Sequence, residues 1–184
     1  MKQIQGDVNL SNLYLKELPS ILTNVSVTGY FHCDDNKLTS LTGAPRSVGQ
    51  DFYCDSNKLT SLAGAPSSVG GSFSCYENKL TSLTGAPSSV GQDFHCRDNK
   101  LTSLEGAPSS VGQDFDCSNN PKLTSLVGAP SSVTGYFSCS DNNLTSLVGA
   151  PSSVGGNFYC NGNATKFTIE QVRAVCDVKG TIFV

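Results

Sequence analysis

The feature that most constrains this chain is a repeat of 21 residues that runs through most of its length. The unit that opens at Phe52 reads FYCDSNKLTSLAGAPSSVGGS, and the next unit opens at Phe73. Pro121 lengthens one unit to 22 residues. Other units open at Phe31, Phe94, Phe115, Phe137 and Phe158. A constant period of this length indicates a solenoid, in which each unit forms one coil and buries its apolar face against its neighbours.

Within each unit the apolar residues recur at the same places. Phe52 and Cys54 are two residues apart, so a short strand would turn both side chains to the inner face of the coil. Leu59, Leu62 and Val69 follow as further inward positions, and the proline of the GAP segment is unsuited to a strand interior. We therefore expect one strand per repeat, with the strands of about eight repeats forming a parallel sheet.

An asparagine stands three residues after each cysteine of the repeat, as Asn57 does after Cys54. A buried amide can both donate to and accept from backbone groups that a tight bend leaves unpaired. The sequence therefore predicts a ladder of buried asparagines that bond to their own turn and to the neighbouring coil.

The chain has eight cysteines, and seven of them recur with the repeat, whereas Cys176 falls outside the series. There is no C-x-x-C pair, so zinc-knuckle spacing is absent. Neighbouring parallel strands lie about 4.8 Å apart, farther than the roughly 3.8 Å that a disulfide prefers between its Cβ atoms. We expect free, buried thiols, which suit a reducing compartment. The first ten residues also lack an apolar run of signal-peptide length, so a cytoplasmic location is expected.

The two ends depart from the repeat and are expected to cap the solenoid. Residues 1–30 read as an N-terminal cap with a divergent first repeat, residues 31–163 as the tandem units, and residues 164–184 as a C-terminal cap. In that last segment Thr168 and Gln171 have the spacing of a helical capping box. Ile169 and Val172, with Val175 or Cys176, would share one helical face, and residues 181–184 read as a short strand. The fold class is an α/β repeat, mostly β, with a helix–strand cap.

The pattern LxxLxxxPxxVxxxFxCxxNxL resembles a leucine-rich repeat in which Phe and Cys take the two strand positions that usually hold Leu. The phrase GAPSSVGGxFxCxxNKLTSL resembles repeats encoded by tailed bacteriophages and some bacteria, over about residues 8–163. The resemblance implies a curved solenoid whose concave face binds a partner, which would be a host protein in the host cytoplasm if the chain is phage-encoded. It is also similar to the repeats of bacterial effector ligases, but no segment here corresponds to their catalytic domain.

Three columns of residues vary from unit to unit, while the inward positions hardly change. They are the residue directly before each Phe, the residue between Phe and Cys, and the residue directly after Cys. Such columns face outward, and they mix aromatic, acidic and basic side chains. Tyrosine and arginine are enriched in the residues that dominate binding energy at protein interfaces. The predicted partner-binding patch comprises Tyr53, Tyr76, Asp93, His95, Arg97, Asp114, Asp116 and Tyr159.

Two sharper interpretations of this patch concern chemistry. Ser74, His95 and Asp116 occupy the same column in three consecutive units, in the order of a serine-hydrolase relay. An open sheet face offers no oxyanion hole and excludes no water, so no catalytic residue is assigned.

A metal site is the second interpretation, because Asp93, His95, Asp114 and Asp116 are near neighbours that could ligate a divalent ion. Arg97 beside them would offset the charge and pair with Asp116. We therefore predict neither a metal nor a cofactor at this face.

Charge and hydropathy narrow the classes of partner. The net charge is −3, with only 15% charged residues, whereas a general nucleic-acid binder would carry a basic stripe. No segment has the roughly 18 consecutive apolar residues of a membrane span. The sequence thus favours a module that binds one protein partner. The alternatives are a structural or self-assembling repeat protein and, third, a hydrolase or metal-dependent enzyme.

Overall fold

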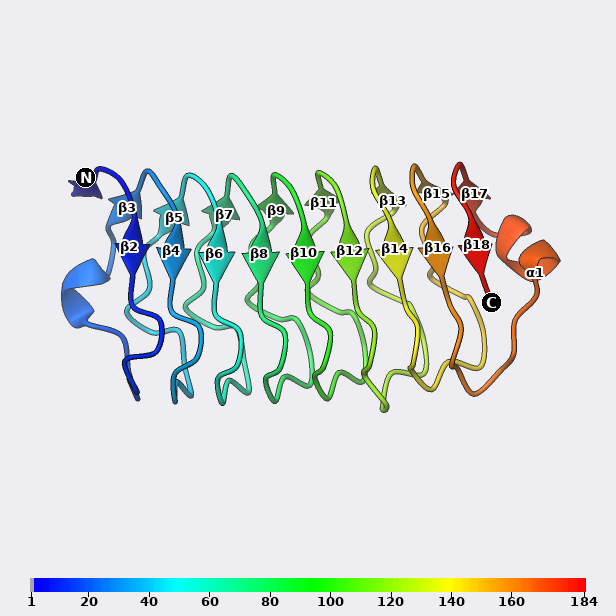
Figure 1. Cartoon of the computed structure of the whole chain (residues 1–184), viewed down its shortest axis with the longest axis horizontal. Helices are drawn as coiled ribbons and strands as arrows, with labels where there is room; N and C mark the ends of the chain where they lie inside the picture. Colours follow the sequence, from blue (N-terminus) through cyan, green and yellow to red (C-terminus); the bar gives the residue numbers. More distant parts are fainter. Residues whose placement is uncertain (1) are drawn as a thin grey trace.

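The computed structural model describes residues 2–184, which form a single stack of coils (Figure 1). The Phe-x dipeptides of successive units pair in parallel and in exact register, with Phe73 opposite Phe94 and Ser74 opposite His95. With one further strand at each end they make a nine-stranded parallel sheet, in which each inner strand lies between the strands of the preceding and following coils. Its strands are β2 (Val8–Asn9), β4 (Phe31–His32), β6 (Phe52–Tyr53), β8 (Phe73–Ser74), β10 (Phe94–His95), β12 (Phe115–Asp116), β14 (Phe137–Ser138), β16 (Phe158–Tyr159) and β18 (Ile182–Phe183).

The structure adds a second strand to each coil, where the sequence predicted one. The Ser-Val dipeptide that precedes the glycine turn forms this strand, with Val buried and Ser turned outward, as at Ser89 and Val90. The strands form a six-stranded sheet and a three-stranded sheet, with the break at the coil that Pro121 lengthens. The first holds β1 (Gln3–Ile4), β3 (Ser26–Val27), β5 (Ser47–Val48), β7 (Ser68–Val69), β9 (Ser89–Val90) and β11 (Ser110–Val111), and the second holds β13 (Ser132–Val133), β15 (Ser153–Val154) and β17 (Asp177–Val178).

Glycine explains why this second sheet forms beside a turn. A Cβ at Gly70 would overlap the carbonyl oxygen of Gly49, and a Cβ at Gly91 would overlap that of Gly70. The coils can approach this closely only because the position has no side chain. The role of these glycines in close stacking was not predicted from the sequence.

The core runs the length of the stack as columns of identical side chains. Phe52 and Phe73 are fully buried, and their rings are stacked with centroids 5.4 Å apart and planes 5° from parallel. The cysteine column is buried beside them, and the Cys54 thiol donates to the carbonyl oxygen of Ser74 at 3.3 Å. All eight cysteines are free and buried, as predicted.

The asparagine ladder is confirmed. The Asn78 amide group donates to the carbonyl oxygens of Cys54, Cys75 and Tyr76 at 3.0, 3.2 and 3.2 Å, and its oxygen accepts the N–H of Leu59 at 2.9 Å. One side chain thus serves its own turn and the preceding coil. Each asparagine is thereby a clamp between adjacent coils.

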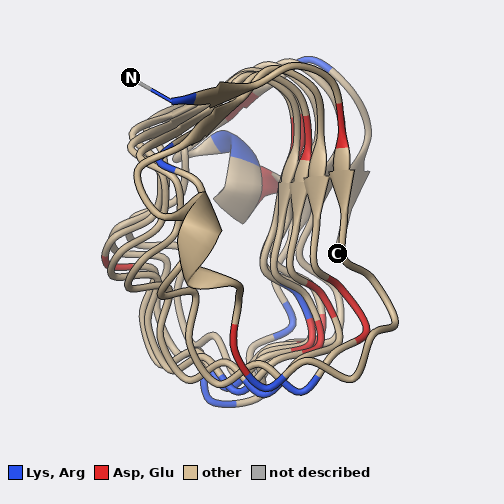
Figure 2. Ribbon diagram, turned by 90° about the vertical axis from the view of Figure 1, so that its left-hand side faces the viewer, with Lys and Arg blue, Asp and Glu red and all other residues tan. Residues whose placement is uncertain are grey.

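The coils lie in an almost straight row in Figure 1, and nearly superimpose when viewed along the stack in Figure 2. A curved solenoid with a concave sheet face was expected. The sheet face that was expected to be concave is the exposed face of the nine-stranded sheet.

Both ends carry additional structure. At the N-terminus a 3-10 helix, η1 (Ser20–Leu22), precedes β3, and Met1 of the predicted cap lies outside the described residues. At the C-terminus Thr168 and Gln171 form the predicted capping box of α1 (Ile169–Arg173). Val172 and Cys176 are buried, whereas Ile169 and Val175 are 41% and 45% exposed, so Cys176 completes the inward face. The predicted last strand is β18, and β17 was not predicted.

No helix within residues 2–184 is both long enough and apolar enough to cross a membrane.

Removing one asparagine clamp should destabilise the whole stack. Asn78→Ala leaves three carbonyl oxygens and one N–H without their buried partner, so we expect the free energy of unfolding to fall by about 3 kcal/mol. Urea denaturation would measure this loss. Lys79→Ala, at the exposed neighbouring position, is the matched control and should change stability by no more than about 0.5 kcal/mol. Equal effects of the two substitutions would contradict the clamp.

The thiols should be unreactive in the folded protein. Burial raises the pKa of the cysteines along the stack, to about 11 at Cys160 and Cys176 and well above the ordinary value at Cys75. Because the thiolate is the reacting form, we expect almost no reaction with a thiol reagent at pH 8. Eight thiols should react after denaturation. Fast modification of the native protein would show that the column is accessible.

Candidate functional site

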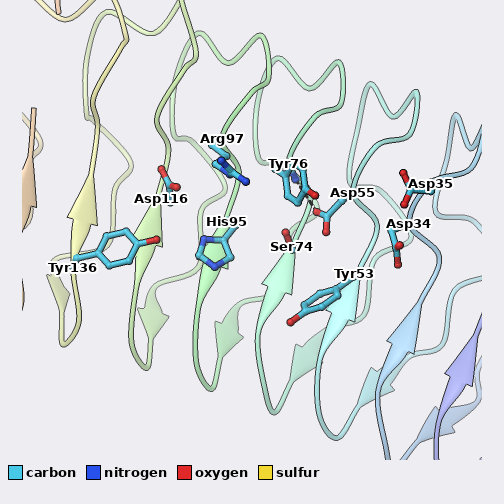
Figure 3. Close-up of a pocket in the computed structure, with 10 residues that line it drawn as sticks. All are labelled: Asp34, Asp35, Tyr53, Asp55, Ser74, Tyr76, His95, Arg97, Asp116 and Tyr136. Atoms are coloured by element: carbon cyan, nitrogen blue, oxygen red, sulfur yellow. Dashed lines mark hydrogen bonds between the residues drawn. The ribbon is translucent and has the colours of Figure 1, made fainter. Parts of the chain in front are cut away.

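The exposed face of the nine-stranded sheet contains a hollow of about 490 Å³ that extends from the coil of β4 to that of β14 (Figure 3). Strand alternation creates it, because Phe and Cys point inward and the residue between them points outward. Five residues of the predicted patch line it, namely Tyr53, Tyr76, His95, Arg97 and Asp116. The patch prediction did not include the other five lining residues, Asp34, Asp35, Asp55, Ser74 and Tyr136.

Asp93 and Asp114 of the predicted patch do not line the hollow, and each bonds to the backbone of the next coil. Asp93 Oδ1 accepts the N–H of Asp114 at 3.1 Å, and Asp114 Oδ1 accepts the N–H of Tyr136 at 2.7 Å. A Cβ at Gly135 would overlap Asp114 Oδ1, so the glycine makes room for the bond. The residue directly before each Phe varies between units, yet Asp93 and Asp114 at this position help to hold adjacent coils together.

Tyr159 lies beyond one end of the hollow, within an aromatic row. Its ring meets Tyr136 edge-on at 5.9 Å and stacks on Phe183 at 4.6 Å. At the other end His32 stacks on Tyr53 with centroids 4.4 Å apart. Aromatic side chains therefore lie at both ends of the hollow along the axis of the stack.

Arg97 lies over the ring of Tyr76, with its guanidinium carbon 4.7 Å from the ring centroid, and its Nη1 is 3.9 Å from Asp98 Oδ2. The predicted pair between Arg97 and Asp116 does not form. Asp116 Oδ1 instead accepts the N–H and the hydroxyl of Ser118 at 3.0 and 2.6 Å. The local turn satisfies the carboxylate, and the arginine is held by a cation–π contact.

Asp55 is the most buried of the aspartates that line the hollow, and sequence reasoning missed it. It is only 6% exposed, and its Oδ1 accepts the N–H of Tyr76 at 2.9 Å. Burial raises its pKa to about 7, and Asp34 adds to the rise, while the bonds from Ser74 and Tyr76 and the charge of Arg97 oppose it. Its burial could not be predicted from the repeat, because Asp34 stands at the same repeat position and remains partly exposed. A buried carboxyl group with a strongly raised pKa is typical of functional sites.

The side chains of the possible catalytic relay point to other partners. His95 Nε2 is 4.0 Å from Asp93 Oδ2, and its Nδ1 is buried without a hydrogen-bond partner. The Ser74 side chain bonds to Asp55. Ser74, His95 and Asp116 are adjacent in register but do not form a proton relay in this arrangement.

The described part of the chain holds no group of three or more His, Cys, Asp or Glu side chains placed to bind a metal ion. The carboxylates of Asp93, Asp114 and Asp116 are each engaged in a separate backbone hydrogen bond. The hollow presents tyrosine rings and carboxyl groups to its interior.

The raised pKa of Asp55 predicts a pH-dependent stability. A carboxyl group whose pKa rises from 3.8 to about 7 on folding stabilises the protein fully below pH 4, and this contribution is lost as the pH rises through 7. Asp55→Asn removes the buried charge and keeps an oxygen acceptor. We expect the variant to be more stable than wild type at pH 8, by on the order of a few kcal/mol, and equal to it at pH 4. Thermal unfolding measured between pH 4 and pH 8 would test this. A difference in stability between variant and wild type that does not change with pH would show that the buried charge is not its cause.

No protein-family model matches this chain. No curated protein matches its sequence either. The candidate site therefore rests on the geometry of the hollow and on the chemistry of the side chains that line it.

Proposed function

We propose that this protein is a binding module that engages a protein partner through the exposed face of the nine-stranded sheet, with the hollow at its centre. The observation that carries the proposal is the collection of Tyr53, Tyr76, Tyr136 and Arg97 around one hollow of an otherwise regular sheet. Tyrosine and arginine in a central pocket are typical of the residues that dominate binding at protein interfaces.

The scaffold supports this role in a second way. The outward side chains stand on strands held in register on both sides, so little conformational entropy remains to be lost on binding. Solenoids of stacked repeats commonly use such an extended sheet face to bind other proteins. We also propose, from the resemblance to leucine-rich and phage-encoded repeats, that the partner is a bacterial host protein met in the host cytoplasm. That interpretation involves no catalysis, nucleic acid or membrane.

Self-assembly is the second candidate function, and the ends of the stack favour it. Tyr14 and Ile21 are 74% and 78% exposed near one end, and Phe183 and Val184 are about 40% exposed at the other. Exposed apolar side chains at both ends would suit end-to-end association of copies. Light scattering over a range of concentrations distinguishes this candidate, because only self-assembly makes the particle size depend on concentration.

The test of the binding role compares two double variants as baits in a lysate of the native host. Tyr76→Ala/Arg97→Ala removes the stacked pair of the hollow, and Lys79→Ala/Lys100→Ala changes two exposed lysines on a neighbouring edge. We expect the wild type and the lysine variant to recover the same protein, and the hollow variant to lose at least about tenfold of it. Melting temperatures should agree, since both pairs are surface residues. Equal recovery by all three baits would place the binding surface elsewhere.

A further inference from the structure

Resting on the proposed binding function, we infer that the hollow seats an extended, basic segment of the partner protein. Its arginine or lysine side chains lie against the tyrosine rings and over the carboxylates of the hollow.

The charge of the hollow is strongly one-sided. Four of its lining residues are aspartates, and Arg97 is the one lysine or arginine among them. With every aspartate ionised and His95 neutral, the lining carries four negative charges and one positive charge. The net charge of the whole chain is −3. Figure 2 shows Asp and Glu along the side that carries the nine-stranded sheet, and Lys and Arg gathered along a neighbouring edge. The face is therefore complementary to a positively charged segment.

The carboxylates of the hollow lack an adequate counter-charge within the chain. Asp55 is buried, and Arg97, the only nearby guanidinium, is engaged with Tyr76 and Asp98. The Nδ1 atom of His95 is buried without a partner in the same hollow. A cationic group entering from a partner would supply the missing charge for Asp55 and polar contacts for the other lining residues.

The tyrosines offer ring faces that suit the same cations. Arg97 on Tyr76 shows that a guanidinium already fits this surface by a cation–π contact. Tyr53 is stacked on His32 on one side, and the next residue of its column is the small Ser74, which leaves the ring open toward the hollow. Tyr136 stands across the hollow from it in Figure 3. Basic side chains can therefore lie between ring faces and carboxylates.

The length of the hollow sets the length of the segment. It extends over six strands, from β4 to β14, and strands about 4.8 Å apart give a span of about 24 Å. An extended peptide rises about 3.3 Å per residue, so about seven residues fill the hollow. The segment crosses the strands and follows the axis of the stack.

The test measures fluorescence anisotropy of labelled heptaarginine, heptalysine and heptaglutamate with the full-length protein at low salt, where surface charge is least screened. Asp55→Asn/Asp116→Asn removes two charges from the hollow, and Glu17→Gln/Glu105→Gln removes two exposed charges elsewhere. We expect the basic peptides to bind wild type and heptaglutamate not to bind. The hollow variant should weaken binding about tenfold or more, and the control variant less than about twofold. Tyr53→Ala removes a half-buried ring that lies outside the core, and it should also weaken binding.

The pH dependence of peptide affinity is a second measurement. It distinguishes binding at Asp55 from nonspecific attraction between a basic peptide and an acidic protein. Asp55 faces Asp34 and Arg97, the phenols of Tyr53 and Tyr76, and the buried thiol column. A bound cation favours its ionised form, so the affinity of wild type for heptaarginine should rise between pH 6 and pH 8. The single variant Asp55→Asn should lose most of this rise.

Two outcomes overturn the inference. The first is that heptaarginine does not bind the wild-type protein. The second is that the hollow variant and the control variant weaken peptide binding equally, because binding would then depend only on the net charge of the protein. Competition separates this inference from the proposed function. A captured partner that needs Tyr76 and Arg97 but resists displacement by heptaarginine leaves the function standing and refutes the basic segment. Peptide binding at the hollow, with capture unaffected by loss of Tyr76 and Arg97, refutes the function instead.

Discussion

The hydrogen bonding between successive coils is the constraint on which the rest of this structure depends. Each strand has only two residues, too few for a stable sheet unless the neighbouring coils repeat its position and register. The backbone groups of one coil are satisfied by the next, as where the N–H of Phe73 donates to Asp93 O at 2.8 Å. The polar groups of the bends are satisfied in the same way by the asparagine column. A coil of this kind has no folded state of its own, so a near-constant period of 21 or 22 residues is a requirement of stability.

This constraint also decides which outward positions are available for binding. Asp114 varies in its column, yet it bonds to the backbone of the following coil, and Gly135 is placed to allow that bond. His95 and Arg97 make no such backbone bond through their side chains, and both line the hollow. Variation between repeats therefore marks two kinds of position, those free for recognition and those that pair with a compensating residue one coil later.

The sequence predicted the stack, the buried cysteines, the asparagine ladder and the capping box, because each depends on a residue type repeated at a fixed distance or on a local motif. It did not predict the Ser-Val strand, since a two-residue strand leaves no alternation to recognise, nor the straightness of the stack. Five residues of the hollow were foreseen from their column. Asp55 was not, because its burial depends on Ser74 and Tyr76 in the next coil, and no rule of spacing distinguishes it from Asp34.

Asp55 connects the stability of the scaffold to the proposed role of its face. A repeat protein could place serine or asparagine at this position without loss, as Ser118, Ser140 and Asn161 show in later coils of the same column. A carboxyl group buried there with its pKa raised to about 7 instead costs folding free energy at neutral pH. A binding site can recover that cost when a cation arrives, because the unfavourable interaction is then relieved in the complex alone. In the proposed complex, a basic segment would therefore offset a cost that the free protein bears at Asp55.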